Sequence, residues 1–264
     1  MGTIADVSDV SVRDLFRLDG RVALVTGAGR GLGEAFSIAL ADMGAQVFLV
    51  SRTQSELATV CETISDRGGE ADCLPCDVAD TARTCEIVEA ACERFGRIDI
   101  LVNCAGTSHP TPSLEATEEQ WESTMNLNAK GTFFLTQAVA KGMIERRYGK
   151  IINIVSHLGF ASIPGRCIYG ASKAALVHMT RILGVEWAPY NINVNALAPS
   201  YTRTRLAWEV LKNEEFRNFV LDNTPLHRIA EPIDMCGAVV YLASDASRMM
   251  TGQTLIVDGG WTAR

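Results

Sequence analysis

Short, almost uninterrupted apolar runs recur along the chain and alternate with stretches of helical periodicity. A strand that is apolar on both sides must be covered on both faces, and such strands are typical of parallel sheets. The pattern therefore predicts an α/β protein with a doubly wound, seven-stranded, mostly parallel sheet and helices on both faces. The apolar runs are residues 21–26, 46–50, 98–102, 151–155, 192–197 and 255–257, with a further strand around residues 73–76.

The first run leads directly into a glycine-rich turn and then into a helical pattern. Thr26, Gly27, Gly31 and Gly33 form the spacing Thr-Gly-x-x-x-Gly-x-Gly. Glycines let the backbone approach a phosphate closely, and a helix N-terminus favours negative charge. We expect this turn to bind the pyrophosphate of a dinucleotide. The alternative is a glycine-rich turn without a ligand.

The end of the second run predicts which dinucleotide binds. An acidic residue about 20 positions after the glycines would bind the ribose 2′-hydroxyl of NAD. This chain has Ser51 and Arg52 there, and Arg30 lies inside the glycine turn. Because guanidinium groups match phosphate in charge and geometry, these residues favour NADP(H), with NAD(H) as the second choice. The alternative is that either arginine is a solvated surface charge.

Three residues in the second half of the chain predict proton-transfer chemistry. Ser156 ends a buried strand, and Tyr169 and Lys173 lie one helical turn apart. A phenol, with an ordinary pKa of about 10, becomes a useful general acid or base when a neighbouring ammonium favours the phenolate. A hydroxyl donor at the carboxyl end of a strand, where open α/β sheets bind ligands, suits proton exchange with a carbinol oxygen. Tyr-x-x-x-Lys also occurs by chance in helices, so the interpretation depends on the glycine turn upstream.

These motifs, in this order, resemble those of the short-chain dehydrogenase/reductase family in its compact single-domain form, a Rossmann fold. The resemblance covers roughly residues 18–261 and departs from the family at Cys104, where an asparagine is usual, and at Ser200, where glycine is usual. It implies that Tyr169 exchanges the proton, that Ser156 binds the substrate oxygen, and that Lys173 also contacts the nicotinamide ribose. Asn128 would hold a relay water. The implied cofactor-binding residues are Gly27, Arg30, Gly31, Leu32, Gly33, Ser51, Arg52, Asp77, Val78, Asn103, Ala105, Gly106, Tyr169, Lys173, Pro199, Thr202 and Thr204.

The chain shows no linker, repeat or low-complexity stretch. We expect one oxidoreductase domain over residues 16–264, preceded by a loosely held extension of residues 1–15. By resemblance, a substrate lid spans about residues 200–223.

The expected lid and the lips of the site predict a small polar substrate. Their side chains are donors suited to hydroxyl groups and a carboxylate. The overall pattern also looks more like the gluconate-dehydrogenase-type members of the family than the steroid ones. The alternative is an apolar pocket, formed if the lid helix turns Leu206, Trp208, Val210 and Leu211 inward. The polar candidates are Tyr201, Thr202, Arg203 and Arg205 in the lid, and Ser108, His109 and His157 at the lips.

The predicted activity is hydride transfer between NADP(H) and a secondary alcohol or ketone, such as a sugar acid or polyol. One alternative is a 3-oxoacyl-carrier-protein reductase, whose partner would dock on Lys130, Arg146 and Arg147. Others are an NAD-linked dehydrogenase and a non-catalytic cofactor-binding regulator. The family also implies a homotetramer that pairs the helices carrying Asn128 and Tyr169. The apolar positions that favour this pairing are Phe133, Phe134, Leu135, Val139, Leu176 and Met179.

Composition excludes several other classes of protein. The net charge is −7, with no basic stripe to bind nucleic acid. No apolar segment reaches the ~18 residues of a membrane span, and the N-terminus lacks a signal-peptide pattern, so we expect a cytoplasmic enzyme with a small-molecule substrate. Cys73 and Cys76 form a Cys-x-x-Cys without a second ligand pair, which predicts no metal.

Overall fold

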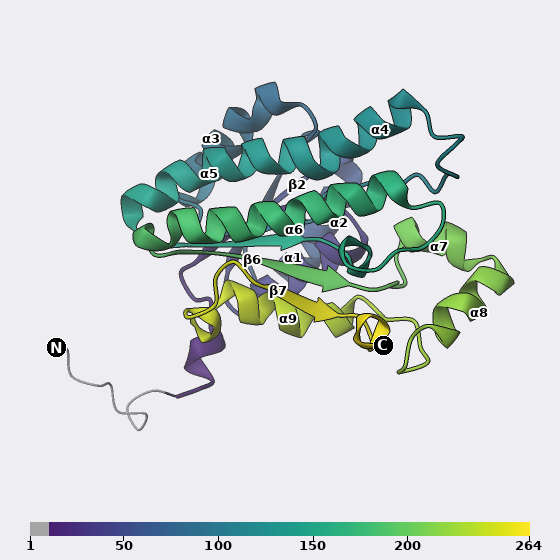
Figure 1. The fold of residues 1–264 in the computed structure, drawn as a ribbon. Helices are drawn as coiled ribbons and strands as arrows, with labels where there is room; N and C mark the ends of the chain where they lie inside the picture. The colour runs from purple at the N-terminus through teal and green to yellow at the C-terminus, as the bar shows by residue number, and fades with distance from the viewer. Residues whose placement is uncertain (1–10) are drawn as a thin grey trace.

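The computed structural model describes residues 11–264 and contains one seven-stranded sheet of order β3-β2-β1-β4-β5-β6-β7 (Figure 1). Every strand pairing is parallel, so the predicted α/β class and strand number are confirmed and the sheet is parallel throughout. The strands are β1 (Val22–Thr26), β2 (Gln46–Ser51), β3 (Ala71–Pro75), β4 (Ile100–Asn103), β5 (Gly149–Ile154), β6 (Ile192–Pro199) and β7 (Thr254–Val257).

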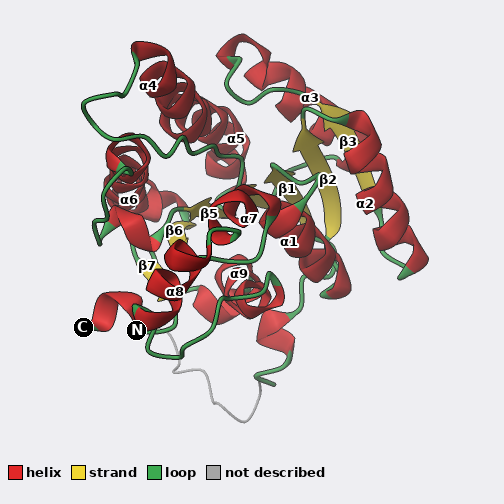
Figure 2. Ribbon diagram, turned by 90° about the vertical axis from the view of Figure 1, so that its right-hand side faces the viewer, coloured by secondary structure: helices red, strands yellow, loops and turns green. Residues whose placement is uncertain are grey.

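Helices cover both faces of this sheet (Figure 2). One layer contains α1, α2 and α9, and the other contains α3, α5 and α6. Phe36 and Leu40, four residues apart in α1, are fully buried against the sheet, as the helical period requires. The helices are α1 (Gly31–Asp42), α2 (Gln54–Asp66), α3 (Thr84–Phe95), α4 (Glu118–Met125), α5 (Thr132–Arg146), α6 (Cys167–Trp187), α7 (Arg205–Leu211), α8 (Glu214–Asp222) and α9 (Ile233–Ala243).

Continuous apolar strands are needed because each strand contributes to two separate cores. In β1, Ala23 and Val25 belong to the core under α1, α2 and α9. Leu24, between them, belongs to the core on the opposite face. Successive side chains of a strand point to opposite faces, so an uninterrupted apolar run fills both layers.

The strand order reverses between β1 and β4, which places a crevice at their carboxyl ends. In open α/β sheets, ligands bind at this switch point. Thr26 ends β1, and its hydroxyl accepts hydrogen bonds from the backbone N–H groups of Cys104 and Ala105, both at 3.1 Å. The glycine turn after β1 and the segment after β4 are therefore fixed to each other.

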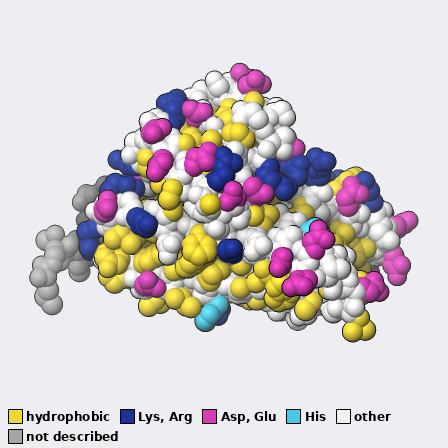
Figure 3. Space-filling model, turned by 90° about the horizontal axis from the view of Figure 1, so that it is seen from above, with side chains coloured by type: hydrophobic (Ala, Val, Ile, Leu, Met, Phe, Trp, Pro, Cys, Tyr) yellow, Lys and Arg dark blue, Asp and Glu magenta, His cyan; other side chains and the backbone are white. Residues whose placement is uncertain are grey.

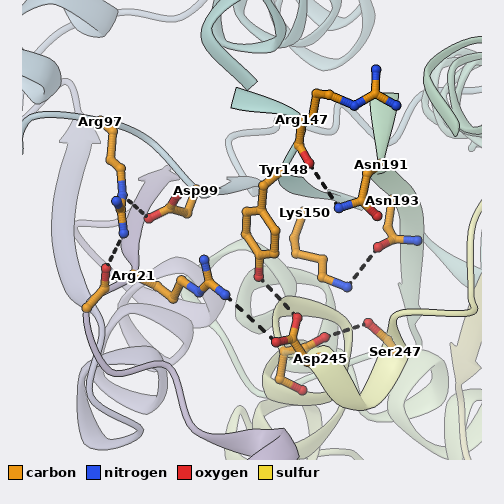
Figure 4. A network of polar contacts seen from close by, with 12 residues as sticks. Arg21, Arg97, Asp99, Arg147, Tyr148, Lys150, Asn191, Asn193, Asp245 and Ser247 are labelled. Atoms are coloured by element: carbon orange, nitrogen blue, oxygen red, sulfur yellow. Dashed lines mark hydrogen bonds and ion pairs between the residues drawn. The ribbon is translucent and has the colours of Figure 1, made fainter. Parts of the chain in front are cut away.

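The opposite, amino end of the sheet is occupied by a polar network (Figure 4). Buried Asp99 accepts from Arg97 Nε at 2.9 Å and from the Val22 backbone N–H at 3.0 Å. Lys150, which is 2% exposed, donates to Asn193 Oδ1 at 2.7 Å, and burial lowers its pKa to about 8. This network holds the strand starts in register and lies away from the crevice.

The predicted N-terminal extension is only partly described, because residues 1–10 lie outside the described residues. A short 3₁₀ turn, Asp14–Phe16, precedes β1. The ring of Phe16 lies 6.3 Å from that of Tyr241 on α9, and Leu18 is 1% exposed. The chain is thus anchored to the core from Phe16 onward.

The region expected to form the lid contains α7 and α8. Tyr201, Leu211, Val220 and Trp261 form a small apolar cluster that holds these helices against the C-terminal segment. Within residues 11–264, no helix has the length and apolar character needed to cross a membrane.

Candidate functional site

A pocket of about 700 Å³ opens at the carboxyl ends of the strands and collects most of the predicted site residues. It is bounded by the glycine turn, the ends of β2 and β5, the start of α6 and the first part of the lid. Two of the predicted residues, Asn103 and Asn128, are not in its lining. The predicted residues in the lining are Gly27, Arg30, Gly31, Leu32, Gly33, Ser51, Arg52, Asp77, Val78, Ala105, Gly106, Ser156, Tyr169, Lys173, Pro199, Thr202 and Thr204.

The glycine turn is too tightly packed for larger residues at two positions. A Cβ on Gly33 would lie 2.2 Å from the carbonyl oxygen of Gly27. A Cβ on Gly27 would lie 2.9 Å from the backbone of Ala105, and Gly27 also has a φ of +64°. The two glycines let the turn pack closely against the start of α1 and against the segment after β4. Because they carry no side chain, a phosphate could also approach the backbone of the turn.

The end of β2 forms a basic corner of the pocket. Arg30 Nη1 lies 2.9 Å from Glu56 Oε1, and Arg205 Nη1 lies 3.8 Å from the same oxygen. Arg52, with its side chain 70% exposed, lies 4.0 Å from Asp77 Oδ2. Glu56, which no sequence motif indicated, partly neutralises this corner.

The hydroxyl of Ser51 is buried at the basic corner without a hydrogen-bond partner. An unpaired buried hydroxyl is costly, and an oxygen-rich ligand would satisfy it. The tight glycine turn, this hydroxyl and the neighbouring arginines together fit a phosphorylated dinucleotide.

The catalytic candidates come from two adjacent elements, with Ser156 directly after β5 and both Tyr169 and Lys173 on α6. Lys173 Nζ donates to the carbonyl oxygen of Ile154 at 2.8 Å and lies 5.7 Å from the centre of the Tyr169 ring. Burial lowers the pKa of Lys173 to about 8. Ser156 Oγ accepts from the backbone N–H of Leu158 at 3.1 Å, which fixes its orientation.

The surroundings of Tyr169 shift the pKa of its phenol in opposite directions. Burial raises the pKa of its phenol, whereas hydrogen bonding with Ser156 and the charge of Arg166 lower it. The sequence pattern named Lys173 as the cation that favours the phenolate. Arg166, three residues before Tyr169, is a second cation that lowers the pKa of the phenol.

Asn128 lies in a π-helical turn, Asn126–Gly131, between α4 and α5. Its Oδ1 accepts from the Thr107 backbone N–H at 2.9 Å, and its Nδ2 donates to the Thr107 carbonyl at 2.9 Å and to Ser172 Oγ at 3.0 Å. Asn128 is fully buried. Its amide therefore clamps the segment after β4 to α6, and π-helical turns are frequent at functional sites.

Asn103 was predicted to bind cofactor, and the structure places its side chain in the core instead. Its Nδ2 donates to Thr136 Oγ1 at 2.8 Å and to Asn153 Oδ1 at 2.9 Å. In a parallel sheet Asn103 pairs in register with Asn153, so their side chains share a face. This side chain links β4, β5 and α5 and does not line the pocket.

Some of the candidate residues in the lid line the main pocket, and others lie outside it. Arg203 pairs with Glu231 at 3.0 Å and lines a second cavity beside α1, together with Trp208. Tyr201 is buried and lines the main pocket, and Leu206 and Val210 also line it. Among the lid candidates, Arg203 therefore has its charge paired outside the main pocket, whereas Thr202 and Arg205 line that pocket.

His157 lines the pocket, although its side chain is buried. Its Nδ1 lies 3.1 Å from the carbonyl oxygen of Pro199, and its ring lies 5.0 Å from that of Trp261. Burial lowers its pKa, so the imidazole is neutral and donates from Nδ1, since a carbonyl only accepts. His109 is exposed and is not in the pocket lining, whereas its neighbour Ser108 is.

The cysteine pair does not form a joint site. Cys73 packs with the core on one face of the sheet, and Cys76 packs with the core on the other. In residues 11–264 the structure contains no group of three or more His, Cys, Asp or Glu side chains arranged to hold a metal ion.

Comparisons with known proteins agree with this geometry. Residues 27–262 match the family model described as enoyl-(acyl carrier protein) reductase. The chain is 39% identical to 2-dehydro-3-deoxy-D-gluconate 5-dehydrogenase of Dickeya dadantii, over 96% of this chain and 100% of that protein. It is 36% identical to D-threitol dehydrogenase of Mycolicibacterium smegmatis, over 99% and 100%.

A solved structure has the same fold as this chain. A gluconate 5-dehydrogenase from Burkholderia cenocepacia, in complex with NADP and tartrate, superposes with a TM-score of 0.93 at 38% identity, over 96% of this chain and 100% of that one. Membership of one family explains three features of this structure. They are the sheet order, the glycine turn, and the pocket that Ser156, Tyr169 and Lys173 line together. This chain belongs to the short-chain dehydrogenase/reductase family and is an NAD(P)-dependent oxidoreductase.

Proposed function

We propose that this enzyme transfers a hydride between NADP(H) and the alcohol or ketone carbon of a small polar hydroxy or keto compound, such as a sugar acid or polyol. The observation that carries the proposal is that the glycine turn and the Ser156, Tyr169 and Lys173 side chains line one continuous pocket. The named activities of the two relatives, on a deoxygluconate and on threitol, support this substrate class.

The cofactor would bind along the glycine turn, with its adenosine end at the end of β2. The buried, unpartnered hydroxyl of Ser51 and the guanidinium groups of Arg30 and Arg52 support a 2′-phosphate there. When bound, the nicotinamide supplies or accepts the hydride. The relative that was solved with NADP supports the choice of NADP(H) over NAD(H).

The protein's own residues manage the proton. Tyr169 would donate its phenolic proton to the substrate oxygen during reduction and take it back during oxidation, while the hydroxyl of Ser156 binds that oxygen. Lys173, with a pKa of about 8, would support proton return and contact the nicotinamide ribose. Asn128 would contribute to the relay and keeps the facing loop in place.

The carrier-protein alternative has weaker support. Arg146 donates to the carbonyl of Ile98 and Arg147 to that of Pro189, both at 2.7 Å. Arg146 ends α5 and Arg147 comes directly after it, at the amino end of the sheet and away from the pocket, and Arg147 is drawn with the network in Figure 4. Of the three docking candidates only exposed Lys130, in the π-helical turn, remains near the catalytic end.

We also propose a homotetramer. Leu135, Val139 and Leu176 are buried within one subunit and are not available to a partner. Phe134 on α5 and Val185 on α6 are 39% and 75% exposed, so they provide a surface for association. Figure 3 shows apolar side chains gathered along one edge of the face seen from above, whereas basic and acidic groups are intermixed over the rest.

The test is a panel of ketones and alcohols followed by NADPH absorbance. We expect higher catalytic efficiency on keto acids of the 5-keto-gluconate type than on a β-ketoacyl thioester. A clear preference for the thioester would instead support the carrier-protein reductase. A panel with no turnover of any carbonyl or alcohol would reject the proposed function.

A further inference from the structure

Arg166 is a pocket residue that no sequence motif singled out. It immediately precedes α6, and its guanidinium Nη1 donates to Ser108 Oγ at 3.0 Å. Arg166, Ser108 and Tyr169 all line the same pocket. The guanidinium therefore lies on the wall that faces a substrate bound at Tyr169.

This arginine differs from the other arginines of the pocket in its partners. Arg30 and Arg205 share Glu56, and Arg52 lies beside Asp77. Within residues 11–264, Arg166 makes no ion pair with a carboxylate. A guanidinium has five N–H donors, and the Ser108 hydroxyl uses one of them. The remaining donors and the positive charge are available to an anion.

Tyr201 adds a second polar group to this wall. Its hydroxyl is buried, and the polar group that acts on it is the guanidinium of Arg166. Burial raises the pKa of Tyr201 to about 12, so the hydroxyl keeps its proton, and the charge of Arg166 acts on both Tyr201 and Tyr169. A ligand oxygen that reached the Arg166 guanidinium would also meet this hydroxyl, which is a hydrogen-bond donor.

The wall is held in position by its backbone. The Thr111 backbone N–H donates to the Gly165 carbonyl at 3.0 Å, which ties the segment carrying Ser108 to the turn before Arg166. The Asn128 clamp on Thr107 fixes the other side of the same segment. Arg166 and Ser108 are thus presented as a prearranged pair rather than as two mobile side chains.

We propose that Arg166, flanked by Ser108 and Tyr201, binds the carboxylate of a hydroxy- or keto-acid substrate. This assignment rests on the proposed function and narrows it, because it selects sugar acids over polyols. A guanidinium fork binds a planar carboxylate through two parallel hydrogen bonds, which a neutral hydroxymethyl group cannot form. From the sequence, Arg203 and Arg205 were the candidates for binding this carboxylate. We assign that role to Arg166 instead.

The test compares gluconate with sorbitol, which has a hydroxymethyl group where gluconate has the carboxylate. Binding is measured by calorimetry to NADPH-loaded protein, which cannot oxidise an alcohol. We expect wild type to bind gluconate at least ~10-fold more tightly than sorbitol. Arg166→Gln should weaken gluconate binding by ~10- to 100-fold, the usual range for a charge-assisted contact, and sorbitol binding by less than ~3-fold.

Two further variants make the result specific. Arg166→Lys keeps the charge but not the fork, so it should restore part of the gluconate affinity. Arg203→Gln removes an arginine of the lid that is paired outside the main pocket, and it should leave the gluconate-to-sorbitol ratio unchanged. NADPH affinity measured by fluorescence should be the same in all variants.

The outcomes separate this inference from the proposed function. Wild type that binds gluconate no more tightly than sorbitol, or Arg166→Gln that weakens both ligands equally, would overturn the carboxylate assignment. Protein that binds gluconate through Arg166 but turns over no alcohol or ketone of the panel would support the assignment and reject the proposed oxidoreductase substrate class.

Discussion

Replacing Asn128 with alanine tests how the site is held together. The amide makes three buried hydrogen bonds, two to the backbone of Thr107 and one to Ser172. Alanine would leave the N–H and the C=O of Thr107 without partners. Each unpaired backbone group costs about 1–3 kcal/mol, so we expect unfolding free energy to fall by roughly 2–6 kcal/mol, toward the lower end if water fills the space.

The assay is urea denaturation of Asn128→Ala beside Asn126→Ala. Asn126 is the same residue type in the same π-helical turn, but it is exposed. Its replacement should change stability by about 0.5 kcal/mol or less. Turnover of Asn128→Ala should also fall, because the segment carrying Gly106 and Ser108 loses its clamp. A loss below about 1 kcal/mol in Asn128→Ala, or an equal loss in Asn126→Ala, would refute this reasoning.

Three other predictions follow from the same structure. Arg52→Asp should shift cofactor preference from NADPH toward NADH, by about 2.7 kcal/mol for a hundredfold change in the ratio of dissociation constants, and equal or tighter NADH binding by wild type would contradict it. The pKa of Lys150 is lowered to about 8 from its ordinary 10.5, so the unfolded chain binds more protons between these values and stability rises with pH there. Relative to Lys150→Met, wild type should gain about 2 kcal/mol between pH 7 and 9.5 in urea titrations, and a constant difference would argue against burial of the charge. Light scattering should give a tetramer mass that decreases in Val185→Glu, whereas a monomer at micromolar concentration would exclude the assembly.

Much of the fold and of the cofactor site was predictable because it depends on short-range patterns. A continuous apolar run indicates a strand that is buried on both faces of a sheet. Such runs correctly predicted the parallel sheet. The turn from Thr26 to Gly33 is a local structure in which a Cβ on Gly27 or Gly33 would lie 2.9 Å or 2.2 Å from the neighbouring backbone, so the glycine spacing is readable from the sequence. Tyr169 and Lys173 lie on one helix, and their relation follows from the helical period.

The parts that were missed depend on contacts between distant segments. The Arg166 side chain is held by a hydrogen bond to Ser108, 58 residues earlier. Neither residue belongs to a periodic pattern from which this contact could be predicted. Asn103 lies beside the segment that was expected to bind cofactor, yet strand alternation turns its side chain to the core. In the loop before α7, Tyr201 turns inward and Arg203 outward, and a loop has no period from which to predict this.

The central claim is that Tyr169 exchanges the proton with the substrate oxygen in an NADP(H)-linked reaction. The most direct test is Tyr169→Phe, which removes the hydroxyl and keeps the ring, with turnover followed by NADPH absorbance and cofactor binding followed by NADPH fluorescence. Because a positioned general acid or base contributes about 10²–10⁴-fold, turnover should fall at least a hundredfold while NADPH affinity stays close to wild type. A variant that keeps more than about a tenth of wild-type turnover would contradict the assignment of Tyr169.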